Sequence, residues 1–225
     1  MRQGSKDRRL EKVVRHRYMD YKFEDHIGKP IPLSRLRLKR ILDIILALIG
    51  MIILAIAVII FGPIIKLTSP GPIFYSQKRV GYMGRPITIH KFRSMRNDAE
   101  KKTGAVWAQK DDPRVTAIGK FMRKTRIDEL PQFWNILVGD MSLVGPRPER
   151  PVLTEEFYER WPEFSKRLRT IPGLTGWAQI NGGYDISPEQ KCHLDNYYID
   201  HWSVWFDIKI IFGTVEIIFT GNGAR

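Results

Sequence analysis

Two adjacent carboxylates, Asp128 and Glu129, follow a basic segment over residues 123–126 and precede Pro131. This order predicts a helix over residues 129–137 with Asp128 at its N-cap. A structural cap needs one carboxylate and no neighbouring cations, and taken alone capping is a sufficient interpretation. Two carboxylates, several cations and the amides of a helix N-terminus together are typical of a site for a phosphorylated ligand. Phosphoryl transfer in particular requires a nucleophile, a metal ligand and cations in one place.

Three further segments hold groups that could bind such a ligand. Lys91 and Arg93 lie at the end of a predicted strand, where the alternative is an ordinary charged strand edge. Arg147 lies between two prolines, which either present its planar guanidinium rigidly to a phosphate or only form a stiff turn. A glycine-rich segment over residues 172–183 contains Gln179, whose amide could bind a sugar or a base. The alternative for this segment is a tight structural loop.

The composition limits the partners that these groups could serve. The chain has 225 residues, 43% of them hydrophobic, and a formal net charge of +13. This length fits one domain, or one domain with an anchor. The charge suggests an anionic partner, which could be nucleic acid, a phosphorylated ligand or anionic lipid. The single cysteine, Cys192, excludes a disulfide within the chain and fits a reducing compartment.

An apolar run over residues 44–65 contains 22 residues and no charge. As a helix it would be roughly 33 Å long, which is near the thickness of the bilayer core, so it predicts a membrane anchor. Both flanks are basic: residues 1–40 hold 13 Lys and Arg against 5 Asp and Glu, and residues 66–96 hold 7 against none. Because basic flanks stay on the cytoplasmic side, the charges favour a re-entrant helix with both ends inside.

A re-entrant helix needs a break in the apolar run. Gly62-Pro63 would supply one, but it lies near the end of the run, and Gly50 is a weaker candidate. An unbroken helix of this length would span the bilayer, so a spanning helix is the alternative.

The remaining pattern predicts an α+β fold that is mostly helical. Its parts are a basic segment over residues 1–38, the anchor over 39–68 and a compact domain over 69–225, which begins with Ser-Pro-Gly-Pro. Residues 204–219 are apolar and aromatic with few charges, a pattern that fits a segment packed on the core or one that lies in the membrane interface. The other expected elements are a hairpin of strands 73–80 and 86–92 and helices over 117–124, 155–169 and 190–198.

Residues 39–220 resemble the bacterial sugar transferases, the monotopic polyprenyl-phosphate phosphoglycosyltransferases. The resemblance depends on ordered motifs that are specific only in combination. They are Lys39-Arg-Ile-Leu-Asp43, Ser69-Pro-Gly-Pro72, Lys91-Phe-Arg-Ser-Met95, Asp112-Pro-Arg-Val-Thr116, Asp128-Glu-Leu-Pro-Gln132, Gly139-Asp-Met-Ser-Leu-Val-Gly-Pro-Arg-Pro148 and Pro172-Gly-Leu-Thr-Gly-Trp-Ala-Gln179.

The resemblance implies that a phospho-sugar passes from a UDP-sugar to a polyprenyl phosphate, usually undecaprenyl phosphate, with release of UMP. It implies that Asp128 is the nucleophile and forms a covalent intermediate, and that Glu129 binds Mg²⁺. Lys91, Arg123 and Arg147 would bind the phosphates, and Arg93 and Gln179 are further candidates for substrate binding.

The resemblance also implies a place in the cell. The catalytic domain, with a short hairpin and interfacial amphipathic helices, would lie on the cytoplasmic face of the bacterial inner membrane. It would catalyse the first membrane step of glycoconjugate synthesis and bind no nucleic acid, while a homodimer is left open. Family members often have Ser-Pro near the middle of the anchor, where this chain has Ala55-Ile56, and longer members have several spanning helices before it. Residues 1–38 are too short and polar for such helices, which indicates the short form.

Two other functions compete with this one. A basic membrane protein without enzymatic activity could bind anionic lipid or nucleic acid, but it would not need the adjacent Asp128 and Glu129. A metal-dependent phosphohydrolase would use water in place of the lipid acceptor, and its release of UMP would not depend on polyprenyl phosphate.

Overall fold

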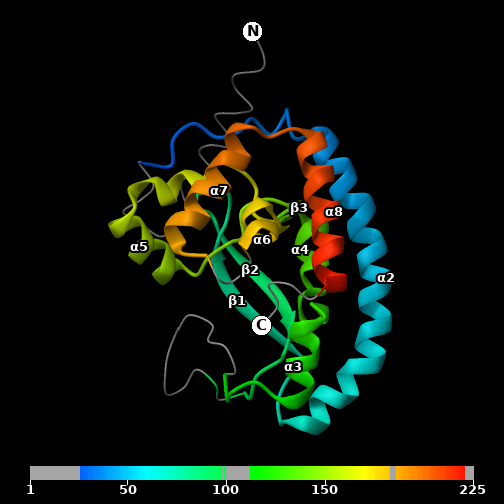
Figure 1. Cartoon of the computed structure of the whole chain (residues 1–225). Coiled ribbons are helices and arrows are strands. Elements are labelled where there is room, and N and C mark those ends of the chain that lie inside the picture. The colour runs from blue at the N-terminus through cyan, green and yellow to red at the C-terminus, as the bar shows by residue number, and fades with distance from the viewer. Residues whose placement is uncertain (1–25, 98, 100–111, 183–185, 221–225) are drawn as a thin grey trace.

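The computed structural model describes residues 26–97, 99, 112–182 and 186–220, so most of the basic segment 1–38 lies outside it. The described residues form a mostly helical α+β fold with one long apolar helix at its side (Figure 1). The helices are α2 (Arg37–Thr68), α3 (Ala117–Lys124), α4 (Gln132–Val138), α5 (Pro151–Arg160), α6 (Trp177–Gly182), α7 (Pro188–Asp200) and α8 (Val204–Thr220). The strands are β1 (Phe74–Val80), β2 (Pro86–Phe92), β3 (Ser142–Val144) and β4 (Gly173–Thr175), and 3₁₀ turns cover Tyr82–Gly84, Ile127–Glu129 and Pro162–Arg169.

Helix α2 has one face in the protein core and the opposite face exposed. Its 32 residues give a helix about 48 Å long, and among the described residues only α2 has the length and apolar composition to cross a membrane. Its exposed face is rich in isoleucine and leucine, from Leu38 to Leu67. Its buried positions recur every three to five residues and are Lys39, Asp43, Ala47, Gly50, Leu54, Ala57, Gly62 and Ile65.

Polar contacts fix the start of α2 to the rest of the fold. The Asp43 carboxylate accepts hydrogen bonds from Ser142 Oγ at 3.0 Å and from the Leu143 amide at 2.8 Å. The Lys39 ammonium is buried and pairs with Asp207 of α8 at 2.8 Å. Lys39 and Asp43 of the Lys39-Arg40-Ile-Leu-Asp43 motif therefore attach the start of α2 to α8 and β3.

The end of α2 is fixed by Arg93, which follows β2. Its guanidinium donates to the carbonyl oxygens of Pro70 at 2.8 Å, Ser69 at 2.6 Å and Ile65 at 3.2 Å. Ile65 lies in the last turn of α2, and Ser69 and Pro70 directly follow the end of the helix. Arg93 thus holds the C-terminal end of α2 against the end of β2.

The helix break expected at Gly62-Pro63 is absent, because α2 continues through Pro63 to Thr68. The helix curves at this end and passes under α3 (Figure 1). A proline within a helix removes one hydrogen bond and bends the axis, which accounts for a curve without a break.

The domain contains two small sheets of two strands each among the described residues. Strands β1 and β2 form the expected antiparallel hairpin, with Phe74 opposite Phe92 and Val80 opposite Pro86. Strands β3 and β4 pair in parallel, which the sequence did not predict. This pairing requires glycine, because a Cβ at Gly173 would collide with the backbone of Gly145. The parallel pair places the loops that follow Val144 and Thr175 at the same edge.

Two helices differ from their expected bounds because of proline. The helix expected over 129–137 is a 3₁₀ turn over Ile127–Glu129 followed by α4, since Pro131 has no amide to donate. The helix expected over 155–169 is divided at Pro162 into α5 and the 3₁₀ helix Pro162–Arg169. Helices α3 and α7 lie where helices were expected, and the apolar segment 204–219 forms α8.

Candidate active site

The adjacent carboxylates Asp128 and Glu129 lie in a 3₁₀ turn and are both buried, with 6% and 7% of their surface exposed. Asp128 is therefore not the N-cap of α4. Pro131 holds that position, and no side chain caps the helix. The capping interpretation of the pair is wrong, and a different reason is needed for the burial of two adjacent charges.

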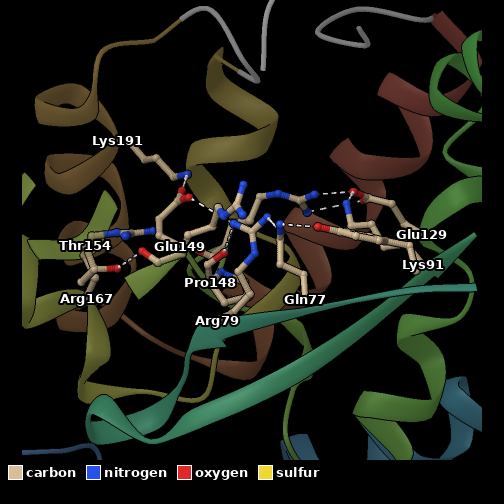
Figure 2. Close-up of polar contacts among 12 residues, drawn as sticks. Gln77, Arg79, Lys91, Glu129, Pro148, Glu149, Thr154, Arg167 and Lys191 are labelled. Atoms are coloured by element: carbon tan, nitrogen blue, oxygen red, sulfur yellow. Dashed lines mark hydrogen bonds and ion pairs between the residues drawn. The ribbon is translucent and has the colours of Figure 1, made fainter. Parts of the chain in front are cut away.

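Glu129 is surrounded by cations from two separate segments. Its Oε1 accepts from Lys91 Nζ at 2.8 Å and from Arg147 Nη2, and Arg147 Nη1 reaches Oε2 at 3.4 Å (Figure 2). Burial alone would raise the pKa of Glu129, but Arg147, Lys91 and Arg126 outweigh it and hold this pKa well below its usual range. Glu129 is consequently ionised at neutral pH.

Asp128 has the opposite electrostatic balance. Burial raises the pKa of this carboxyl to about 6, although Lys91, Arg123 and Arg147 act in the other direction. The charge of Glu129 contributes to the rise. A pair of adjacent carboxyls with divergent pKa values is typical of sites in which the two groups have different roles.

The chain enters this pair through a strained turn. Helix α3 begins at its N-cap Thr116 and ends at Lys124, and Arg126 then has φ 59°, in the left-handed region. This conformation costs a residue with a side chain roughly 1–2 kcal/mol. The reversal at Arg126 turns the following carboxylates back toward β2, and strain next to reactive groups is common in functional sites.

Lys91 reaches Glu129 because α4 holds β2 in place. The Asn135 amide donates to the Thr88 carbonyl at 2.7 Å and accepts from the His90 amide at 3.1 Å. Asn135 therefore bridges α4 to the strand one residue before Lys91. A single polar residue in the apolar segment Phe-Trp-Asn-Ile-Leu-Val was the available sequence signal for this role.

Gln179 lies near the same edge, in α6. Its Oε1 and Nε2 are both buried, and neither has a hydrogen-bond partner among the described residues. Its turn is next to the Arg147 loop, because a Cβ at Gly176 would collide with the Gly145 carbonyl. A buried amide without partners is costly, so a ligand with polar groups would stabilise it.

The structure thus brings together most of the predicted site residues. Lys91 and Arg147 contact Glu129, and Arg123, which donates to Ser94 Oγ at 3.0 Å, lies close enough to lower the pKa of Asp128. Arg93 is the exception, because its described contacts go to the end of α2.

The carboxylates offer few ligands for a metal ion. Among the described residues, no group of three or more His, Cys, Asp or Glu side chains could hold one. Mg²⁺ nevertheless commonly binds through one or two carboxylates together with substrate phosphates and water. The pair Asp128 and Glu129 fits a Mg²⁺ ion of that kind, and not an ion held entirely by protein.

Comparison with known proteins gives matches over most of the chain. The family model described as bacterial sugar transferase matches residues 34–221. The chain is 42% identical over 212 residues to the UDP-N-acetylgalactosamine-undecaprenyl-phosphate N-acetylgalactosaminephosphotransferase of Aeromonas hydrophila, covering 92% of this chain and 50% of that protein. It is 41% identical over 216 residues to the UDP-glucose:undecaprenyl-phosphate glucose-1-phosphate transferase of Escherichia coli K12, covering 90% and 46%.

A third relative is covered over more of its length. The protein of the same name from Caulobacter vibrioides is 40% identical over 203 residues, which cover 88% of this chain and 76% of that protein. The chain spans about half the length of the Aeromonas and Escherichia relatives.

The raised pKa of Asp128 predicts a dependence of stability on pH. A carboxyl whose pKa rises from 3.8 to about 6 on folding destabilises the protein as pH increases through that window. The full cost, on the order of 3 kcal/mol, is present above pH 6. We expect Asp128→Asn to raise the Tm in detergent by roughly 5 °C at pH 8, and by less at pH 5. The exposed Asp200 is the control, and Asp200→Asn should show no such difference. An equal rise in the Tm of Asp128→Asn at pH 8 and at pH 5 would contradict the raised pKa of Asp128.

Proposed function

The chain belongs to the bacterial sugar transferase family, and from this membership we propose that it transfers a phospho-sugar from a UDP-sugar to polyprenyl phosphate and releases UMP. The observation that best supports the proposal is the buried pair Asp128 and Glu129 within a group of cations. The relatives named for this reaction use undecaprenyl phosphate, so we propose undecaprenyl phosphate as the acceptor.

In the first step Asp128 is the nucleophile. A carboxylate oxygen attacks the sugar-linked phosphorus, the bond from that phosphorus to the bridging oxygen breaks, and UMP departs. An aspartyl phospho-sugar remains on the enzyme. The pKa of about 6 leaves Asp128 mostly ionised at neutral pH and more basic than an ordinary aspartate, which favours attack.

In the second step a phosphate oxygen of the polyprenyl phosphate attacks the same phosphorus. The bond to Asp128 breaks, the carboxylate is restored, and the product is a polyprenyl diphospho-sugar. Lys91, Arg123 and Arg147 stabilise negative charge on the phosphoryl oxygens in both steps, because each already influences the Asp128 carboxylate. Gln179 binds a polar group of the substrate with its unpartnered amide.

Glu129 would hold Mg²⁺ together with phosphate oxygens of the substrate. The ion, when bound, would reduce the repulsion between the Asp128 carboxylate and the diphosphate. Glu129 also positions Lys91 and Arg147, whose contacts with its carboxylate hold them beside Asp128.

The relatives' names differ in the sugar, which is N-acetylgalactosamine in one and glucose in others. The direct test is to incubate the purified protein with a panel of UDP-sugars, with and without undecaprenyl phosphate, and to measure UMP. Multiple-turnover release that requires undecaprenyl phosphate supports a transferase. Equal release without it indicates a phosphohydrolase, and no release with any sugar contradicts both enzymes.

We expect Asp128→Asn to abolish transfer, with a loss of at least about 10³-fold, because the amide cannot attack phosphorus. Intact-mass spectrometry of the wild type with the active UDP-sugar alone should show a phospho-sugar adduct, and the variant should show none. Asp200→Asn serves as the matched control and should keep wild-type activity. Substantial turnover by Asp128→Asn would refute the covalent step.

Glu129→Gln should lower activity by about 10²-fold and weaken the response to added Mg²⁺, because a carboxylate is lost from a site for a hard cation. EDTA should silence the wild type, and Mg²⁺ should restore it. Glu189, which is exposed on α7, provides the control, and Glu189→Gln should respond to Mg²⁺ as the wild type does. Full wild-type activity in EDTA would exclude a role for Mg²⁺.

We further propose that the anchor is re-entrant through the bend of α2 near Pro63, in place of the expected break, with residues 1–36 and the catalytic domain both in the cytoplasm, because both flanks of α2 are basic. Cysteine labelling in intact cells with a membrane-impermeant maleimide tests this topology. A cysteine at Ser94 would mark the catalytic domain, but Ser94 is buried and accepts a hydrogen bond from Arg123. The exposed Glu189 is therefore the better position for the labelled cysteine in this domain. The native Cys192 is buried, and burial raises its pKa to about 11, so it should not react.

We expect Ser5→Cys and Glu189→Cys to label only after the cells are permeabilised. Ser5 lies outside the described residues, so its exposure is tested by its labelling in permeabilised cells. Labelling of Ser5→Cys alone in intact cells would mean that α2 spans the bilayer.

A further inference from the structure

The loop over residues 146–150, between β3 and α5, presents Arg147 to Glu129 and has no regular secondary structure. All five of its carbonyl oxygens nevertheless accept a hydrogen bond. Backbone amides supply three of these bonds. The Gly173 amide donates to the carbonyl of Pro146, the first residue of the loop. The Val80 and Thr154 amides donate to the carbonyls of the fourth and fifth residues, respectively. Arginine side chains supply the other two, from Arg167 to the second carbonyl and from Arg79 to the third.

The carbonyl bound by Arg167 is that of Arg147 itself. Pro146 and Pro148 each have a fixed φ, and a residue before proline is restricted to extended backbone. The main torsions left free beside Arg147 are ψ of Pro146 and φ of Arg147 itself, and rotation about φ moves the Arg147 side chain relative to the Arg147–Pro148 peptide plane. Arg167 Nη2 donates to the oxygen of that plane at 2.9 Å, so it fixes the direction in which the Arg147 side chain leaves the backbone.

Arg167 is itself held on its other edge. Its Nε donates to Asp195 Oδ2 of α7 at 2.7 Å, and its guanidinium lies 4.3 Å from the centre of the Phe164 ring. Both charged partners are buried, with 3% of Arg167 and none of Asp195 exposed. A buried ion pair is seldom more stabilising than an apolar pair of the same size, so stability alone is a weak reason for this one. The planar guanidinium of Arg167 binds the Asp195 carboxylate with one edge and the Arg147 carbonyl with the other. Holding these two groups in a fixed geometry is a better explanation for the buried pair than stability.

A second contact secures the same loop at Glu149. This carboxylate is buried between Lys191 of α7, which donates to Oε1, and Arg79 of β1, which lies 3.5 Å from Oε2 (Figure 2). Figure 2 shows these contacts as a connected series that extends from Lys191 and Arg167 at one end to Glu129 and Lys91 at the other. The loop is therefore supported from α7, β1 and the 3₁₀ helix Pro162–Arg169.

We propose that Arg167 is a positioning residue for the transfer: held by Asp195, it fixes the peptide plane at Arg147 and so places the Arg147 guanidinium beside the reacting carboxylates. This inference depends on the proposed function. Arg167 does not touch the substrate, and its effect on the reaction passes through Arg147.

The test is a double-mutant cycle of Arg167→Lys and Arg147→Lys, with kcat and KM for the UDP-sugar measured by UMP release. Lysine keeps the charge that Asp195 needs but cannot hold both partners with one planar fork. We expect Arg167→Lys to lower kcat by roughly 10–100-fold with KM changed less than about 3-fold, because misplacement by about 1 Å costs up to about 10²-fold. In the Arg147→Lys background the same substitution should lower kcat by less than about 2-fold.

The matched control is Arg169→Lys on the same 3₁₀ helix. Arg169 pairs with the exposed Asp200 and donates to the Lys166 carbonyl, away from the Arg147 loop, so kcat should not change. If Arg167→Lys does not fold, Asp195→Asn is used instead, because this substitution loosens Arg167 without removing it. Asp195→Asn should lower kcat by a smaller factor than Arg167→Lys, and its effect should likewise not add to that of Arg147→Lys.

Each outcome decides the proposal. Equal losses in the two backgrounds would show that Arg167 acts independently of Arg147, and an unchanged kcat would show that the peptide plane needs no such support. Either result overturns the inference and leaves the proposed function intact. A wild-type protein that releases no UMP with any UDP-sugar overturns both.

Discussion

The structure depends on the burial of two adjacent carboxylates, a state that is stable only with cations around them. Asp128 and Glu129 repel one another, and burial removes the water that would otherwise screen them. The compensating charges come from different elements: Lys91 from β2, Arg147 from the loop after β3, and Arg123 from α3. The hairpin, the parallel strand pair and α3 must all meet at this turn for the pair to be tolerated. The same convergence provides the positive potential that a diphosphate substrate requires.

The cations are useful only if they are held in place, and the fold achieves this mostly with contacts to the backbone. Asn135 secures the strand next to Lys91, Ser94 accepts from Arg123, and Arg167 binds the carbonyl of Arg147. In this arrangement each cation that would meet the substrate is held by contacts to its own side chain or to the backbone next to it. Rigid support of this kind reduces the reorganisation that would otherwise accompany charge development in the transition state.

The sequence predicted the local elements well and the long-range contacts poorly. The hairpin, α3 and α7 follow from alternation, capping residues and helix propensity, which are local properties. The pairing of Asp128 and Glu129 with Lys91, Arg123 and Arg147 was reached from residue types and a family resemblance. The parallel pairing of β3 with β4 was missed because each strand has only three residues, too few for a periodic signal. Arg93 was assigned to substrate because a charge at a strand end does not show which neighbour it will meet. Arg167 and Asp195 were missed for the same reason, since 28 residues separate them in the chain.

The two faces of α2 have a practical consequence for anyone who handles the protein. The side chains that face inward complete the hydrophobic core: Ala47 packs with Ile87 and Ile136, and Leu54 packs with Phe92 and Met122. Truncation before the hairpin would therefore not yield a soluble enzyme, because it would expose that core, remove the Lys39 ammonium that pairs with Asp207 and remove the carbonyls that Arg93 binds. The exposed isoleucine and leucine side chains on the opposite face of α2 favour an apolar environment over water. A detergent or nanodisc would cover this face, and because the opposite face of the same helix completes the core, the choice of amphiphile should alter catalysis as well as solubility.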